Sequence, residues 1–336
     1  MEIKKRKIPH KDDLNLDLIL RPKSFDEYIG QESAKKGLGI MIQAAKQRKE
    51  AVDHLLFYGQ AGLGKTTLAC LVAKELNANL KITSGPAIEK AGDLAAILTN
   101  LEPQDILFID EAHRLNRLIE EILYPAMESR RLNIVIGKGP ASRIISLELP
   151  SFTLIAATTR VNLLSGPLRS RFGASFRLDY YKEKEIEEII RRSAGLLGVD
   201  VEKKAIEVLA KASRFTPRVA NRLLKRSRDY LEVCGGKIIG EKEAKKILEI
   251  LDIDDFGLEV HDRKLIEIII KDFRGGPVGV NALSATLNEE KGIIEEVYEP
   301  YLIKIGFLKR TPLGRVASSQ AYSHLGYENL YFQRSK

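Results

Sequence analysis

The feature that most constrains this chain is a phosphate-binding loop, Gly59–Thr66, which matches G-x-x-x-x-G-K-[ST] at every fixed position. An apolar run, Leu55–Tyr58, precedes the loop as a buried parallel strand would, and a helical pattern follows it. This order is required because the loop N–H groups and the helix N-terminus must face the same phosphates. The sequence therefore predicts a nucleoside triphosphate site, and a glycine-rich turn without a ligand is the weaker alternative.

Two loop side chains and two carboxylates have predicted roles toward that nucleotide. Lys65 would reach the β- and γ-phosphates, and the Thr66 hydroxyl would hold Mg²⁺. A second apolar run, Ile106–Ile109, ends in Asp110 and Glu111. Asp110 suits the second shell of Mg²⁺, and Glu111 suits activation of the attacking water as a general base. Because a kinase of small molecules does not need the second carboxylate, this pair favours hydrolysis.

Three further positions could act on the γ-phosphate. Thr159 follows a third apolar strand and could hold the water, although the alternative is that Thr158 and Thr159 only cap the strand. The turn Pro167–Phe172 carries two arginines, one of which could neutralise transition-state charge as an arginine finger. Arg218, near the start of a helix, could close over the phosphates and report the nucleotide state.

The pattern of strands and helices changes along the chain. Strands alternate with helices first, which predicts an α/β fold with a parallel sheet. An entirely helical stretch follows, and the last part shows three helices and a basic hairpin, as in a winged helix. The predicted limits are 1–20 for an N-terminal arm, 21–180 for the ATPase domain, 181–255 for a helical lid, 256–327 for the winged helix and 328–336 for the remnant of a purification tag.

Composition narrows the class of partner and the location. The chain has 54 Lys and Arg against 46 Asp and Glu, a net charge of +8, which favours a polyanionic partner. The alternative is a surface that is simply well solvated, as in a thermophile. The two cysteines lack metal-ligand spacing and fit a reducing cytoplasm, and no apolar stretch reaches membrane-spanning length.

Together these motifs resemble those of the AAA+ ATPases. The order and the flanking residues are most similar to the bacterial members that drive branch migration at Holliday junctions, over nearly the whole range Leu20–Gly326. The most specific matching strings are Phe25–Gln31, Thr83–Pro86, Asp110–Asn116, Ile136–Pro140, Pro167–Gly173, Arg274–Gly279 and Tyr298–Tyr301.

The resemblance implies a full set of site residues, with ATP and Mg²⁺ as cofactors. The implied ATP-binding residues are Leu20, Arg21, Tyr28, Ile29, Gly62, Gly64, Lys65, Thr66, Thr67, Tyr181 and Arg218. The implied catalytic residues are Glu111, Asp110, Lys65, Thr159 and Arg171, of which Arg171 would enter the site of a neighbouring subunit. Thr66 and Asp110 would be the metal ligands.

The same resemblance implies DNA contacts and protein partners. Arg310 and Arg315 on the basic hairpin match DNA-backbone contacts, to which Lys291 and Lys309 could add. An inserted hairpin at 132–149 would dock a junction-binding partner protein, and the chain would form a hexameric ring with no membrane association.

The sequence departs from the family pattern at three positions. Ala112 replaces the usual Ile and is expected to change packing, and Phe215 replaces a Gly before Arg218, where it could alter the lid pivot. Leu313 replaces an Arg in the hairpin turn and would remove one phosphate contact.

The sequence therefore predicts an ATP hydrolase that moves duplex DNA in recombination and repair, as part of the DNA-damage (SOS) response. Two alternatives remain at this point. One is an ATP-gated winged-helix regulator that binds DNA without moving along it. The other is a clamp-loader-like AAA+ ATPase that acts on protein partners. A solvated basic hairpin on a protein-binding winged helix would fit the second.

Overall fold

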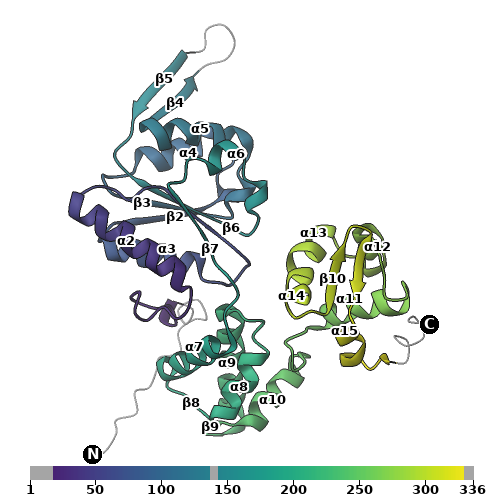
Figure 1. Ribbon diagram of the computed structural model, residues 1–336. Coiled ribbons are helices and arrows are strands. Elements are labelled where there is room, and N and C mark those ends of the chain that lie inside the picture. Colours follow the sequence, from purple (N-terminus) through teal and green to yellow (C-terminus); the bar gives the residue numbers. More distant parts are fainter. Residues whose placement is uncertain (1–17, 137–142, 329–336) are drawn as a thin grey trace, which may run out of the picture. The chain divides into compact units, whose positions relative to one another are not determined.

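The computed structural model describes residues 18–136 and 143–328 (Figure 1). The tag remnant predicted at 328–336, apart from Glu328, lies outside the described residues, as do most of the predicted N-terminal arm and the turn of the 132–149 hairpin. The chain divides into two compact units, Met1–Gly198 with Thr216–Asn221 and Val199–Phe215 with Arg222–Lys336. These units cut the chain at different places from the predicted domain limits, which stay predictions.

The first unit is built on a five-stranded sheet whose strands all run parallel. The predicted α/β fold with a parallel sheet is confirmed. The strand order across the sheet is β2 (Leu80–Ser84), β3 (Ile106–Asp110), β6 (Thr153–Thr158), β1 (Leu55–Tyr58) and β7 (Ala174–Arg177).

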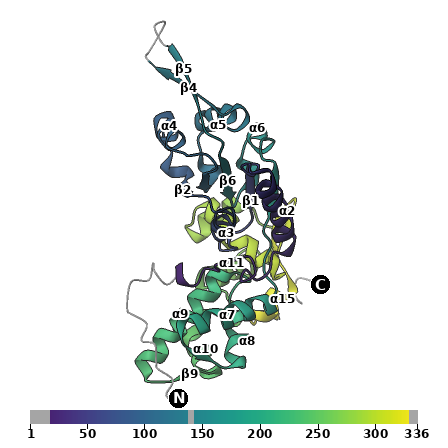
Figure 2. The ribbon, with the colours of Figure 1, turned by 90° about the vertical axis from the view of Figure 1, so that its left-hand side faces the viewer.

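Helices cover both faces of this sheet, because the central strands are apolar on both sides. Alternate residues, such as Leu107 and Ile109, join one core cluster with α4, α5 and α6, and the intervening residues face α2 and α3 (Figures 1 and 2). These helices are α2 (Glu32–Arg48), α3 (Lys65–Leu76), α4 (Ala91–Thr99), α5 (Arg117–Ser129) and α6 (Gly166–Arg169). The next helix along the chain, α7 (Glu183–Leu197), does not lie on the sheet (Figure 1). Short 3₁₀ turns lie at Gly85–Ala87, Ala112–Arg114 and Val161–Leu163.

The predicted inserted hairpin is present as an antiparallel pair, β4 (Arg131–Ile136) and β5 (Arg143–Glu148). It follows α5 directly and projects beyond that helix in both Figure 1 and Figure 2. Ile145 and Leu147 on β5 are 43% and 37% exposed. The hairpin thus presents apolar side chains away from the sheet.

The second unit begins with a helical part. A short parallel pair joins β8 to β9, and α8 packs against α10. The elements are β8 (Asp200–Val201), α8 (Lys203–Lys211), α9 (Pro217–Cys234), β9 (Ile238–Ile239) and α10 (Glu241–Ile250). The first residues of α9, up to Asn221, cluster with the first unit.

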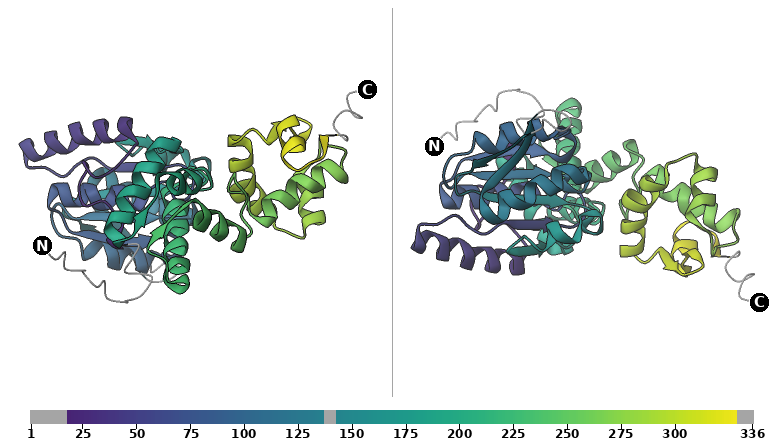
Figure 3. Two further views of the ribbon diagram at one scale, coloured as in Figure 1. Left: turned by 90° about the horizontal axis from the view of Figure 1, so that it is seen from below. Right: turned by 90° about the horizontal axis from the view of Figure 1, so that it is seen from above.

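The rest of the second unit is the winged helix, whose helices and hairpin enclose a separate apolar core (Figure 3). Its elements are α11 (Val260–Lys271), α12 (Val280–Leu287), α13 (Lys291–Ile293), α14 (Glu299–Lys304), β10 (Leu308–Thr311), β11 (Gly314–Ala317) and α15 (Ser319–His324). Between α13 and α14 the helical stretch is interrupted by a π-helical turn, Ile294–Tyr298. Pro300 explains this turn, because it has no N–H to continue the α-helical bonding pattern.

Within residues 18–136 and 143–328, the longest helices are too short or too polar to cross a membrane.

Candidate active site and nucleic-acid interface

The sheet brings three predicted motifs to one edge. Strand β6 lies between β1 and β3, with Thr158 paired to Tyr58 on one side and Ala156 paired to Ile109 on the other. All three strands are parallel, so their carboxyl ends meet at the same edge. The phosphate-binding loop, the Asp110–Glu111 pair and Thr159 are therefore neighbours.

Close backbone packing makes glycine necessary in the loop. Gly59 has a φ of 143°, and a Cβ there would lie 2.3 Å from the Leu178 carbonyl oxygen. Gly64 has a φ of 97°, and a Cβ would lie 2.7 Å from the Tyr28 hydroxyl. At these two positions the loop can hold its curved form only without a side chain, and such a curve directs successive N–H groups inward. This cradle fits a polyphosphate.

Lys65 is almost fully buried in that cradle, at 8% exposure. Its Nζ donates to the Gly59 and Gln60 carbonyl oxygens, both at 2.8 Å. Burial lowers the pKa of Lys65 to about 8; Asp110 opposes that shift and Arg218 adds to it. A phosphate beside this ammonium would supply the negative charge that its surroundings lack.

The two predicted metal ligands lie together. Thr66 Oγ1 donates to Asp110 Oδ2 at 3.3 Å, and Asp110 Oδ1 accepts from the Glu111 N–H at 2.9 Å. One hydroxyl and one carboxylate are oxygen donors of the type that Mg²⁺ takes alongside phosphate and water. No cluster of three or more His, Cys, Asp or Glu side chains suited to a metal occurs in the described residues.

Glu111 stands just beyond the strand in a left-handed conformation, with a φ of 49°. Its side chain is exposed and pairs with Arg114 at 3.4 Å. A non-glycine residue in this conformation is strained, and such strain is typical of functional positions. Glu111 is thus directed outward from the sheet edge rather than into the core.

His113 and the two threonines separate into different environments. Thr158 is buried, and its Oγ1 lies 3.0 Å from His113 Nδ1 and accepts from the Arg160 N–H at 2.9 Å. Burial lowers the pKa of His113, which favours the neutral ring in this bond. Thr159, in contrast, is exposed at the strand end. Thr158 therefore makes the structural bond to His113, and Thr159 remains the candidate for holding the attacking water.

The predicted adenine-side residues also come together. Leu20, Tyr28 and Tyr181 are buried, and Ile29 is half-buried. The Tyr181 hydroxyl lies 3.3 Å from both the Tyr28 hydroxyl and the Leu63 carbonyl oxygen. Burial raises the pKa of Tyr181 to about 12, so the phenol stays neutral and polar. This pair places two aromatic rings directly behind the loop.

Arg192 on α7 is a functional candidate that the sequence reasoning missed. Its Nη1 donates to the Leu20 carbonyl oxygen at 2.9 Å, and its Nη2 donates to the Arg21 carbonyl oxygen at 3.3 Å and to Glu27 at 2.8 Å. These bonds fix the segment that carries the adenine-side residues. The available signal was helical spacing, which puts Arg192 beside the buried Ser193 while Arg191 faces solvent.

The candidate finger, Arg171, is held against α5. Its Nη1 donates to the Pro167 carbonyl oxygen at 2.6 Å, and its Nη2 pairs with Glu128 at 3.0 Å. The guanidinium also lies 4.4 Å from the centre of the Tyr124 ring. Its Nε is buried without a hydrogen-bond partner in the described residues. Arg218, the other candidate arginine, lies beside the loop, with its Cβ 3.0 Å from where a Cβ on Gly62 would be.

The four residues predicted to contact DNA differ in their exposure. Lys291, Lys309 and Arg310 are exposed. Arg315 lies opposite Arg310 in register, but its side chain is only 8% exposed and its Nε donates to Glu299 at 2.7 Å. Its Nη2 donates to Glu295 at 2.8 Å. The structure therefore places three cations on the surface and one inside an acidic cluster.

The three residues that depart from the family pattern lie in different environments. Ala112 is fully buried in the core cluster of the sheet unit, as expected of a packing change. Leu313 is 82% exposed in the hairpin turn. Phe215 has a φ of 54°, a conformation that glycine adopts without strain.

Family models match three consecutive parts of the chain, and all three belong to the same family. Residues 20–178 match the family model for the Holliday junction DNA helicase RuvB P-loop domain. Residues 181–254 match the RuvB AAA lid domain, and residues 255–326 match the RuvB C-terminal winged helix domain.

Two curated relatives are both named Holliday junction branch migration complex subunit RuvB. The one from Fusobacterium nucleatum is 58% identical over 313 residues, 93% of this chain and 94% of the relative. The one from Dehalococcoides mccartyi is 55% identical over 320 residues, 95% and 92% of the two chains. A solved structure of Thermotoga maritima RuvB, titled a Holliday junction branch migration motor, has a TM-score of 0.85 at 52% identity and covers 92% of this chain and 99% of that chain.

The low pKa of Lys65 predicts that ATP affinity falls as pH rises. Bound phosphate favours the ammonium, so the pKa of Lys65 is higher with ATP than the value of about 8 without it. Above pH 8 binding must then take up a proton, and affinity is expected to fall toward about tenfold per pH unit. Titration calorimetry from pH 7 to 9.5 measures this slope. In Lys65→Arg the guanidinium stays charged, so an equal slope in that variant would contradict the assignment.

Arg192→Ala is expected to weaken ATP binding by roughly tenfold, because charged hydrogen bonds that fix the Leu20–Arg21 backbone are lost. Fluorescence titration with a labelled ATP analogue provides the measurement. Arg191→Ala is the matched control, one residue away on the same helix and exposed. Equal losses in the two variants would show that only surface charge matters.

Proposed function

Since the chain belongs to the RuvB family, we propose that it uses ATP hydrolysis to drive branch migration at Holliday junctions. The observation that carries the proposal is one chain that holds a phosphate-binding loop beside the Asp110–Glu111 pair and a winged helix with exposed cations. Membership makes the chain an ATP-dependent helicase of recombination and repair. It favours the motor over the ATP-gated regulator and the clamp-loader-like ATPase.

The chemistry that we propose follows from the site. Mg²⁺ held by Thr66 and Asp110 would neutralise charge on the phosphates. Lys65 holds the β- and γ-phosphates through its buried ammonium. Glu111 accepts the proton of the attacking water, and Thr159 orients that water. Both residues are exposed at the same sheet edge, where a water can reach them.

We propose further that the site is shared between subunits of a hexameric ring. Arg171 is bound to α5 within its own chain, through Glu128 and Tyr124. In the proposed ring this guanidinium would reach the site of a neighbouring copy, as the resemblance implied, and such a finger adds roughly 10³–10⁵ in rate. Arg218, beside Gly62, would sense the nucleotide within the same chain.

The hairpin formed by β4 and β5 is the proposed docking element for a RuvA-like junction-binding protein. Exposed Ile145 and Leu147 are the apolar residues that support this. DNA contacts are proposed for Lys291, Lys309 and Arg310, which can bind phosphates of any sequence. For Arg315 the two glutamates favour a role in fixing the wing over a direct phosphate contact. We place the protein in the cytoplasm, in the response to DNA damage.

The test of the motor is dissociation of a synthetic four-way junction. With ATP and purified RuvA-like partner, the junction is expected to separate into duplexes, and omission of ATP is expected to prevent it. Deletion of part of the β4–β5 hairpin should spare ATP hydrolysis and remove stimulation by the partner. ATP-dependent DNA binding without any dissociation would instead support the regulator.

The shared site predicts complementation between two inactive variants. Arg171→Ala should bind ATP normally and lose at least about 10³ of its turnover, because the finger is absent. Glu111→Gln should also be inactive, but mixed rings contain some interfaces with an intact glutamate and an intact finger. Phosphate release from the mixture is therefore expected to exceed that of either variant alone. The matched control is Arg169→Ala, an exposed arginine of the same turn. Normal turnover by Arg171→Ala would end the shared-site proposal.

Arg310→Ala is expected to weaken duplex binding equally for all sequences and to reduce the slope of log affinity against log salt by about one. Fluorescence anisotropy at several salt concentrations measures both. Lys304→Ala, an exposed cation outside the hairpin, is the matched control. A loss confined to particular sequences would contradict backbone contact. Arg315 is less suitable for this test, because its removal leaves Glu299 buried beside no cation.

A further inference from the structure

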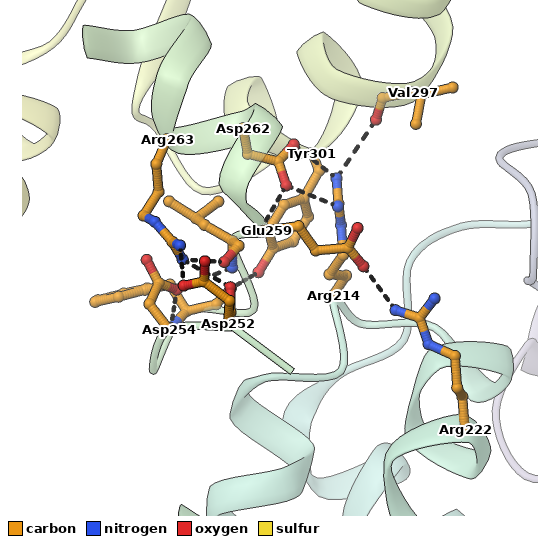
Figure 4. Close-up of polar contacts among 11 residues, drawn as sticks. Arg214, Arg222, Asp252, Asp254, Glu259, Asp262, Arg263, Val297 and Tyr301 are labelled. Carbon is orange, nitrogen blue, oxygen red and sulfur yellow. Dashed lines mark hydrogen bonds and ion pairs between the residues drawn. The ribbon is translucent and has the colours of Figure 1, made fainter. Parts of the chain in front are cut away.

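One arginine of the second unit, Arg214, makes a buried ion pair with the winged helix (Figure 4). It follows α8, and its Nη1 and Nη2 donate to Asp262 Oδ2 at 3.0 Å and Asp262 Oδ1 at 3.4 Å. The side chains of Arg214 and Asp262 are 14% and 1% exposed. Because the two bonds are parallel, they fix the direction of the guanidinium as well as its distance.

The same arginine reaches two more elements of the winged helix. Its Nη2 donates to the Val297 carbonyl oxygen in the π-helical turn at 3.4 Å, and its Cζ lies 4.5 Å from the centre of the Tyr301 ring in α14. The next residue, Phe215, places its ring 6.2 Å from that of Tyr301 and packs against the winged-helix core. Two consecutive residues thus contact α11, the π-helical turn and α14.

The backbone at this point is strained. Arg214 and Phe215 have φ values of 55° and 54°, in the left-handed region that side chains disfavour. Two such residues in succession persist only where their surroundings fix them. The contacts of both side chains with the winged helix supply that constraint. They also account for Phe215, which stands where the family usually has glycine.

The strained pair, Arg214 and Phe215, lies where the chain passes from one unit to the other. Phe215 is the last residue of a segment that clusters with the second unit, and Thr216 is the first of the segment Thr216–Asn221 that clusters with the first unit. That segment contains Arg218, which lies beside Gly62 of the phosphate-binding loop. The chain therefore passes from the nucleotide-side segment to the Arg214 anchor within a few residues.

Other bonds hold the stretch between α10 and α11, Asp252–Gly257. Asp254 accepts from the Phe256 and Leu258 N–H groups at 2.9 Å and lies 2.7 Å from His324 Nε2. Tyr301 donates its hydroxyl to the Phe256 carbonyl oxygen. This connection is therefore held in place by hydrogen bonds. A further pair, Arg222 with Glu259 at 2.7 Å, is half-exposed and contributes little.

We propose that Arg214 is a positioning residue that locks the winged helix to the end of α8, so that displacement of Thr216 and the first turn of α9 moves the wing as a rigid body. This rests on the proposed motor function, in which nucleotide state must reach the DNA. Arg214 touches neither nucleotide nor DNA in this scheme. It acts through the Asp262 pair and the Tyr301 ring.

The first test measures the lock itself and needs no motor activity. Spin labels are placed at Lys242→Cys in α10 and Ala285→Cys in α12, both exposed, in a full chain whose Cys70 and Cys234 are replaced by alanine. Pulsed dipolar spectroscopy is expected to give one narrow distance distribution, which broadens when Arg214 is replaced. A distribution that is equally narrow without Arg214, or equally broad with it, would overturn the proposal.

Three variants separate locking from folding. Arg214→Ala leaves the Asp262 carboxylate buried without its cation and could unfold the unit. Arg214→Met with Asp262→Asn removes both charges at similar volume, so it is expected to remain folded by circular dichroism while losing the lock. Arg214→Lys keeps the charge but not the paired donors, and an intermediate width is expected. Arg226→Ala on α9 is the control for loss of an exposed arginine.

The second test measures coupling as junction dissociated per ATP hydrolysed. The Met/Asn double variant is expected to keep DNA-free ATP hydrolysis and duplex binding within about twofold, while dissociation per ATP falls at least about fivefold, as for the loss of a typical coupling between sites. An unchanged ratio with a broadened distance distribution would overturn the coupling role. If the unaltered protein fails to dissociate junctions, the proposed function fails instead, and the distance measurement still decides the lock.

Discussion

Burial of a single ammonium group, that of Lys65, governs the design of the first unit. An isolated buried lysine is unfavourable, and here it is tolerated because two loop carbonyl oxygens accept from its Nζ and Asp110 lies near. The carbonyl oxygens face Nζ because the loop curves through Gly59 and Gly64. At these two glycines Leu178 and Tyr28 approach the loop too closely for a side chain. The two glycines and the residues packed against them thus help to hold the buried ammonium of Lys65 in place.

Much of the first unit follows from local sequence. The phosphate-binding loop, its strand and the Asp110–Glu111 pair are contiguous patterns, so their neighbours in space are set by the parallel sheet alone. The order of the strands in the sheet could not be predicted from any single segment of the sequence. It depends on β6 entering between β1 and β3, which is a matter of long-range packing.

What the sequence did not disclose depends on long-range contact. Arg192 binds backbone carbonyl oxygens 171 and 172 positions away, and Arg214 binds Asp262 48 positions away; no local pattern shows either partner. The resemblance implied DNA contacts for both Arg310 and Arg315. The two are cross-strand partners and both pair with Glu295, but only Arg315 also pairs with the buried Glu299 and is itself buried. Helical periodicity likewise could not show the π-helical turn before Pro300.

The shared position of Glu295 has a consequence for how firmly the wing holds a nucleic acid. This carboxylate accepts from Arg315 at 2.8 Å and from Arg310 at 3.4 Å, so the surface arginine already has an anionic neighbour inside the protein. In the proposed DNA contact a phosphate would compete with that neighbour, and the net gain from each contact would be smaller than for an unpaired guanidinium. An internal competitor of this kind would shorten the lifetime of each contact. For the proposed motor, which would release one phosphate to take the next, such weak retention would be an advantage that Glu295 supplies without any change in the cations themselves.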